Sequence, residues 1–296
     1  MRRLIVNADD FGLTAGVNRA IVELHQAGVL TSATLMARAA ATDEAIEIAL
    51  STPSLGVGCH VVLVDGEPVL SPAQDVPNLA DPIGGLFRPT LGSFLRWLYT
   101  ARMRPLHEVP AREIEAEAAA QIALLQSRGV RLTHIDTHKH THMFPAVLRP
   151  VLRAARAAGI HAVRNPFEPA WSVRATPEAR WLRRVQVGLL RRMEPAFRRI
   201  VTEEGFTTTE GAIGVLATGT LDSATVNSLL RSLPDGTFEL VTHPGYNDAD
   251  LASAHTRLLE SRATEMNALP ELRNHSELHL QSFGQIASAG TVLAKD

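Results

Sequence analysis

The residues most able to do chemistry lie in one short segment of the 296-residue chain. Four histidines and an aspartate fall within nine residues, at His134, Asp136, His138, His140 and His142. Neutral imidazoles and a carboxylate placed together suit a divalent metal ion. A lone histidine is more often a polar group that has found a hydrogen-bond partner, and a solvated polar turn is the simpler interpretation of the segment. The number of imidazoles beside the aspartate favours the metal site.

Other candidate groups follow separate apolar runs. Asp9 and Asp10 end the first run, His60 follows small residues at 56–59, and His243 precedes a Pro-Gly turn. Adjacent residues of a regular strand point to opposite sides, so both aspartates reach one site only if the strand ends there. The pair also suits a turn that caps a helix, and His60 suits a core position. His243 stays open between a general acid, a further metal ligand and a loop residue.

The hydrophobic pattern predicts strands that alternate with helices. Apolar runs predict strands at 3–6, 30–36, 55–63, 130–135, 160–164 and 238–242. Helix-periodic segments predict helices at 14–28, 40–50, 113–128 and 257–269, and others that begin at 145 and 222. Alternation of this kind, without internal repeats, predicts parallel βαβ units.

The candidate residues lie at or just beyond the carboxyl ends of these predicted strands. In a (β/α) barrel such ends converge on one face, where active sites are built. An open doubly wound sheet would gather them along one crevice instead, which explains less well how five segments meet. The pattern therefore predicts an α/β fold in the form of a (β/α) barrel.

The composition limits the partners and the cellular compartment that we expect for the protein. The balance of 29 basic against 31 acidic residues gives a net charge of −2, which provides no global field for nucleic acid. The single cysteine, Cys59, cannot form an internal disulfide, and this fits a reducing compartment. No apolar run is long enough to span a bilayer, and the N-terminus lacks the apolar core of a signal peptide. We expect a cytoplasmic protein.

Three motifs resemble those of the YdjC-like carbohydrate deacetylase family. They are NADDFG at 7–12, GCH at 58–60 and DTHKHTH at 136–142, and the likeness extends from residue 3 to at least residue 245. Within the family, residues 60–69 and 138–140 are most similar to the hopanoid-biosynthesis-associated deacetylases. The resemblance implies a distorted TIM-like (β/α) barrel of the sugar deacetylase type, as a single domain over residues 1–296. It also implies metal-dependent removal of N-acetyl groups from amino sugars.

The resemblance also implies roles for individual residues. By position, the metal ligands are Asp10, His60 and His138, the general base is Asp9, and His243 matches a candidate acid. Zn²⁺ fits such a ligand set, and Mg²⁺ or Mn²⁺ would also fit. The metal would polarise the acetamide carbonyl and activate water.

Four further residues are placed less firmly. Arg164 is similar to an arginine that orients the base in the wider polysaccharide deacetylases. His140 and His142 would orient the metal ligands without binding the metal themselves. Cys59 departs from the larger residue that relatives often have, but it neighbours a ligand rather than being one.

We expect the substrate to carry N-acetylglucosamine, with a glycosylated hopanoid lipid as the closest match and a chito-oligosaccharide as the alternative. A metallophosphatase or nuclease would use similar ligands, but the chain lacks a glycine-rich phosphate cradle. A non-catalytic sugar-binding protein would keep the ligands without a base, and Asp9 is present.

Two segments stand out as additions to a barrel. Residues 65–110 are expected to form a substrate loop, because long connections inside compact domains are usually functional. Residues 170–205 are expected to form a basic helical insertion. Its arginines accompany an apolar stripe at helical spacing, formed by Trp181, Leu182, Val185, Leu189 and Met193.

The apolar stripe has two interpretations. It could pack on the barrel as an ordinary surface helix. Alternatively, it could rest on an anionic membrane with the arginines toward lipid headgroups, which would place the enzyme at the periphery of the inner membrane. Exposed apolar faces and the family resemblance are also compatible with a homodimer.

Overall fold

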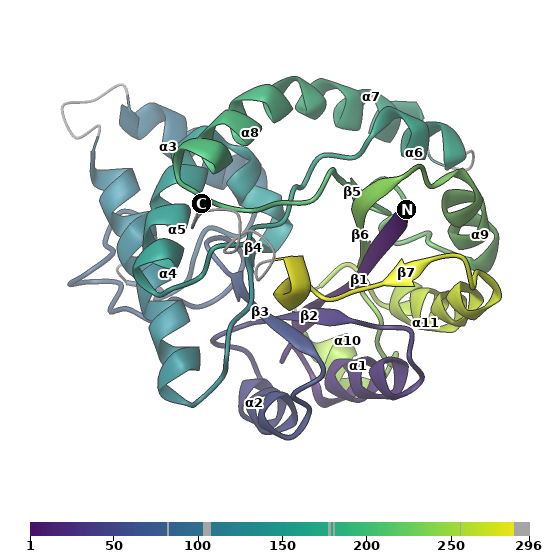
Figure 1. Cartoon of the computed structure of the whole chain (residues 1–296). Coiled ribbons are helices and arrows are strands. Elements are labelled where there is room, and N and C mark those ends of the chain that lie inside the picture. The colour runs from purple at the N-terminus through teal and green to yellow at the C-terminus, as the bar shows by residue number, and fades with distance from the viewer. Residues whose placement is uncertain (82, 103–107, 177–178, 180, 255, 287–296) are drawn as a thin grey trace, which may run out of the picture.

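A seven-stranded parallel sheet forms the centre of the computed structural model, which describes residues 1–81, 83–102, 108–176, 179, 181–254 and 256–286 (Figure 1). The strand order is β4-β3-β2-β1-β6-β5, with β7 paired beside β1. The strands are β1 (Arg2–Phe11), β2 (Ser32–Leu35), β3 (Gly56–Val61), β4 (Ile135–Thr137), β5 (Ala212–Ile213), β6 (Gly236–Thr242) and β7 (His279–Leu280).

The central strand β1 is apolar on both faces. Leu4, Ile5, Val6 and Ala8 are all fully buried, as expected for a parallel strand covered on both sides. Beyond β4 the sheet continues through two isolated parallel bridges, which join Ile135 to Val163 and Ala162 to Thr207. The sheet therefore curls into a half-barrel rather than an open doubly wound sheet. The strand predicted at 160–164 is reduced to these bridges.

Helices surround the outside of the curled sheet (Figure 1). Thr14 and Asp222 cap α1 and α9 by accepting hydrogen bonds from backbone N–H groups. The helices are α1 (Ala15–Gln26), α2 (Thr42–Ser51), α3 (Leu91–Arg102), α4 (Val109–Ser127), α5 (Pro145–Ala157), α6 (Ala170–Ala175), α7 (Trp181–Leu190), α8 (Glu194–Glu203), α9 (Ser223–Ser232), α10 (Ala249–Ser253) and α11 (Glu260–Ala268). Three 3₁₀ segments complete the described elements: η1 (His138–Met143), η2 (Arg191–Met193) and η3 (Leu269–Asn274).

The chain thus forms a single α/β domain, and the predicted fold class is confirmed. The segment 65–110 is not irregular throughout, because it contains α3 and the first residues of α4. The segment 170–205 contains α6, α7 and α8. Residues 82, 103–107, 177–178 and 180, which fall in these two segments, lie outside the described residues. Among the described residues, no helix combines the length and the apolar character that crossing a membrane requires.

The apolar stripe of α7 faces away from the barrel. Trp181 is 69% exposed, and Leu182, Val185 and Leu189 are 53–59% exposed. Only Met193, the last member of the stripe, packs against the core. The interpretation that this stripe packs on the barrel is therefore wrong for four of its five residues.

Close packing holds β3 against the start of the histidine segment. The ring of His134 stacks on Phe283 with centroids 3.9 Å apart. On the other side of the ring, a Cβ atom added to Gly58 would lie 2.5 Å from His134 Cε1. Real Cβ atoms do not approach that closely, so β3 and β4 can pair here only because residue 58 has no side chain.

We predict that Gly58→Ala lowers the free energy of unfolding by about 1–3 kcal/mol, because the added methyl group overpacks the core. Gly188→Ala in α7 is the matched control, since no atom lies within 4 Å of the added Cβ. That control is expected to gain about 0.5–1 kcal/mol from helix propensity. Urea unfolding measures both values. Equal stability of the two variants would contradict this packing constraint.

Candidate metal centre

The side chains of the histidine segment diverge where the chain leaves β4. Lys139 and His140 adopt left-handed backbone conformations, with φ of 55° and 52°, which cost roughly 1–2 kcal/mol each for residues other than glycine. An ion pair of 2.5 Å between Lys139 Nζ and Asp65 Oδ2 holds this turn to the segment that follows β3. The turn sends the four histidines to different places, so the even alternation in the sequence does not give one cluster.

Only part of the segment reaches the candidate site. His138 approaches Asp10 and His60, and His140 lines the same pocket. His142 is buried behind it, where its ring contacts Thr137 Oγ1 at 2.7 Å and the Arg164 carbonyl oxygen at 3.2 Å. His134 is a core residue, so its inclusion among the candidate metal histidines is wrong.

Asp9 and Asp10 both face the pocket although β1 continues to Phe11. The pairing of β1 with β2 shifts register between Ala8 and Phe11, and Asp10 has φ of 62°. This irregularity, rather than the expected end of the strand, turns two consecutive side chains to one side.

Asp10, His60 and His138 form a compact set of three donor atoms. His60 Nε2 lies 3.2 Å from His138 Nδ1 and 3.5 Å from Asp10 Oδ1, and His138 Nδ1 lies 3.4 Å from Asp10 Oδ1. Tetrahedral bonds of the length found for zinc would separate such donor atoms by roughly 3.4 Å. The three residues could therefore hold a metal ion, and the other coordination positions would stay open.

A neighbouring carboxylate prepares His60 for this role. His60 Nδ1 lies 2.8 Å from Asp136 Oδ1. A proton on Nδ1 donated to Asp136 leaves a lone pair on Nε2, which is the usual outer partnership of metal-binding histidines. Burial disfavours the charged ring, but Asp136, Asp9 and Asp10 together outweigh burial and raise the pKa of His60 to about 9. Metal binding would therefore release a proton.

A second group of possible ligands, formed by Asp9, His60 and Asp136, is already neutralised. Arg164 binds both oxygens of Asp9, at 2.8 and 2.6 Å, and also contacts Asp136. Its Nε donates to Glu239 Oε1 at 2.8 Å. Because the guanidinium occupies the carboxylates, a cation would have to displace it from this second group.

The electrostatics of the network follow from burial and from Arg164. Burial alone would raise the pKa of Asp9, but the arginine outweighs it and lowers that pKa well below the usual range. Glu239 contacts the same guanidinium through Oε1 only. The effect of burial is therefore larger than that of the arginine, and the pKa of Glu239 rises to about 7. Asp9 therefore stays ionised although it is only 3% exposed.

His243 directly follows β6, whereas η1 follows β4. These two strands lie on opposite sides of β1 in the sheet order. Its Nε2 lies 3.8 Å from Asp9 Oδ2, and its backbone N–H donates to Glu265 Oε2 at 2.6 Å. Burial opposes protonation of the ring, but Glu265 and Asp9 together raise the pKa of His243. The ring can therefore carry a proton beside Asp9.

Sequence reasoning missed two buried residues of α11. Arg262 Nη2 contacts Asp10 Oδ2 at 2.5 Å, and Glu265 holds the backbone of His243. An arginine and a glutamate three residues apart on a helix usually face solvent, and the helical pattern carried no sign that this pair is buried. Only the packing of α11 beneath the site reveals their role.

The candidate site residues line a pocket of about 520 Å³. Its walls combine the polar groups with apolar side chains from several loops, as in sites for small organic ligands. The apolar members are Leu13, Met36, Pro89, Leu91, Val215 and Leu258.

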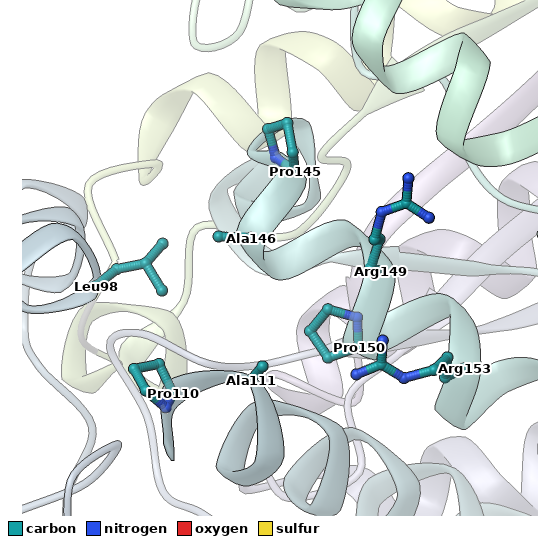
Figure 2. A pocket seen from close by; sticks show the side chains of 8 residues that line it. All are labelled: Leu98, Pro110, Ala111, Pro145, Ala146, Arg149, Pro150 and Arg153. Carbon is teal, nitrogen blue, oxygen red and sulfur yellow. The ribbon is translucent and has the colours of Figure 1, made fainter. Parts of the chain in front are cut away.

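A separate pocket of about 250 Å³ lies among α3, α4 and α5 (Figure 2). None of its eight lining residues is acidic or a histidine. Its two arginines are paired, Arg149 with Glu203 and Glu204 and Arg153 with Glu115. This pocket therefore has no group for acid–base or metal chemistry.

We predict that Arg164→Gln lowers the free energy of unfolding by about 3–5 kcal/mol, because it leaves buried carboxylates without their counter-charge. Arg149→Gln is the control, since it breaks two partly exposed ion pairs, each worth about 0–1 kcal/mol. Urea unfolding at neutral pH measures both. A loss at Arg164 no larger than the loss at Arg149 would show that the network is not the charge balance described here.

The protein resembles known proteins over nearly its whole length. A carbohydrate deacetylase of Brevibacillus brevis is 35% identical over 285 residues, which cover 95% of this chain and 96% of that protein. A chitooligosaccharide deacetylase of Salmonella typhimurium is 39% identical over 160 residues, or 54% of this chain and 58% of that one.

The fold is similar to that of a crystal structure from Enterococcus faecalis described as a putative cellobiose-phosphate cleavage protein. The TM-score is 0.75 at 25% sequence identity, with 96% of this chain and 98% of that chain covered. The family model described as YdjC-like protein matches residues 3–277. The chain, with its half-barrel and its paired aspartates, belongs to the YdjC-like protein family.

Proposed function

We propose that the protein is a metal-dependent hydrolase that removes the N-acetyl group from an N-acetylglucosamine-bearing substrate. The observation that carries this proposal is the set of Asp10, His60 and His138 donor atoms at 3.2–3.5 Å, with Asp9 and His243 beside it in one pocket. The names of the curated relatives, which are carbohydrate and chitooligosaccharide deacetylases, support the class of reaction.

In this proposal Asp10, His60 and His138 hold the divalent metal, either zinc or magnesium. The metal would polarise the amide carbonyl and lower the pKa of water. Asp9 accepts a proton from the attacking water as general base. Asp9 then passes that proton on to His243, whose Nε2 lies 3.8 Å from Asp9 Oδ2. His243 protonates the departing amine, so acetate and a free amino sugar result.

Arg164 has a positioning role in this scheme. Its two bonds to Asp9 fix the carboxylate plane and keep the base ionised. A metallophosphoesterase remains the rival enzyme class because it would use similar ligands. The names of the curated deacetylases do not favour this class, and the sequence has no glycine-rich phosphate cradle.

We predict that His138→Ala loses metal and activity together, because it removes a ligand, whereas Asp9→Asn keeps metal and loses most turnover, because it removes the base. Metal content by plasma mass spectrometry and acetate release from N-acetylglucosamine conjugates give the two readouts. A chelator should abolish acetate release from the unaltered protein, and added metal should restore it. Full metal content and full rate in His138→Ala would contradict the ligand assignment.

The finer part of the proposal concerns the substrate, for which we propose a lipid-linked amino sugar such as a glycosylated hopanoid. The exposed stripe of α7 supports contact with a membrane surface, since its aromatic and aliphatic side chains have no cover from the barrel. Arg183 of the same helix lines the pocket, so α7 connects the apolar stripe with the candidate site. A chito-oligosaccharide is the alternative.

The arginines of α7 contribute less to a membrane surface than their number suggests. Arg183 donates to the carbonyl oxygens of Val215 and Thr218, and Arg184 donates to those of Val173 and Thr176. Both guanidinium groups are thereby directed toward the protein. The membrane contact proposed here rests mainly on the apolar stripe, and contact with anionic headgroups is left to arginines further along the segment.

We predict that the protein binds liposomes containing anionic lipid, and that a Leu182→Ser/Val185→Ser/Leu189→Ser variant binds them much less, because it removes the apolar contact. Leu50→Ser is the control, since Leu50 is equally exposed, at 53%, but lies on α2. Vesicle co-sedimentation measures binding, and light scattering measures oligomeric state. A dimer that the triple variant converts to a monomer, without liposome binding by either, would assign the stripe to a homodimer instead.

A further inference from the structure

The carboxylate of Asp10 is divided between two partners. Its Oδ1 atom lies 3.5 Å from His60 Nε2 and 3.4 Å from His138 Nδ1, inside the candidate metal set. Its Oδ2 atom lies 2.5 Å from Arg262 Nη2. One oxygen therefore faces the site, while a guanidinium occupies the other.

Arg262 is built into the protein beneath the site. Its side chain is fully buried, and its Nε donates to the Leu258 carbonyl oxygen at 3.1 Å. A Cβ atom added to Gly245 would lie 3.1 Å from Arg262 Cδ. The Pro-Gly turn after His243 therefore leaves space through which the arginine extends from α11 to β1.

Stability alone explains this arginine poorly. Burying an ion pair costs desolvation energy that the attraction often only balances. Within the described part of the chain, Arg262 Nη1 has no hydrogen-bond partner, and an unsatisfied buried donor costs about 1–3 kcal/mol. A buried charge that is incompletely satisfied, and that contacts a candidate ligand, indicates a role at the site.

The neighbouring aspartate provides an internal comparison. Arg164 engages both oxygens of Asp9, so neither is left free of a guanidinium. Arg262 engages one oxygen of Asp10 and leaves the other to the histidines. The two arginines thus hold adjacent carboxylates in different ways, and the difference matches a base on one side and a ligand on the other.

We propose that Arg262 is a positioning residue that holds Asp10 as a one-oxygen ligand of the metal. By occupying Oδ2, it prevents the carboxylate from binding through both oxygens and so keeps a coordination position open for water or substrate. This inference rests on the proposed function for the identity of the ligands. It differs in its test, because it concerns metal binding rather than deacetylation.

The test uses metal-free protein titrated with zinc in a calorimeter, together with the visible absorption spectrum of the cobalt-loaded protein, which reports coordination number. Arg262→Gln removes the charge, and Arg262→Lys retains it on a narrower headgroup. Arg231→Gln in α9 is the control, since Arg231 is an exposed arginine that does not line the pocket. Circular dichroism and urea unfolding of the metal-free variants establish that each is folded.

We expect the zinc affinity of Arg262→Gln to differ by about 10-fold or more from that of the unaltered protein, because the variant frees the second oxygen of Asp10 and removes a positive charge beside the metal set. We also expect its cobalt spectrum to shift toward a higher coordination number, because both Asp10 oxygens become available. Arg262→Lys should fall between this variant and the unaltered protein, and Arg231→Gln should match the unaltered protein in both readouts.

Several results would overturn the inference. A folded Arg262→Gln variant with unchanged zinc affinity and unchanged cobalt spectrum would remove it while leaving the proposed function intact. Unfolding of both Arg262 variants would make Arg262 a structural residue and would also overturn it. Failure of the unaltered protein to bind any divalent metal would overturn both this inference and the proposed function.

Discussion

The structure depends on neutralising several carboxylates that are buried close together on strands of the curled sheet. Arg164 serves Asp9, Asp136 and Glu239, and Arg262 serves Asp10. Ionised carboxylates without such partners would be too costly to bury and would take up protons instead. The curled sheet brings the acids together, and the arginines let at least the two aspartates of β1 remain charged there.

This charge balance also separates the chemical roles of two adjacent residues. A bulge in β1 turns Asp9 and Asp10 toward one pocket, where a regular strand would have separated them. Each then receives its own arginine, from a different part of the fold. Two aspartates that look equivalent in the sequence thereby acquire different surroundings, and different surroundings are how proteins give like groups unlike tasks.

Much of this arrangement could be predicted from the sequence. The alternation of apolar runs and amphipathic segments was enough for the parallel sheet, and placement at strand ends was enough to expect the candidate groups on one face. The choice of Asp10, His60 and His138 among them came from the family resemblance. The burial of Arg262 could not be predicted, since a helical pattern shows spacing but not which polar residue extends beneath a neighbouring strand. The exposure of the α7 stripe was equally hidden, because an apolar stripe has the same spacing whether or not another element covers it.

Anomalous diffraction at the metal absorption edge, from crystals of the protein grown with zinc, tests the central claim most directly. The account predicts one peak in contact with Asp10 Oδ1, His60 Nε2 and His138, with Arg262 still on the other oxygen of Asp10 and Arg164 still on Asp9. A peak among Asp9, His60 and Asp136, with Arg164 displaced, would contradict the division of roles between the two aspartates.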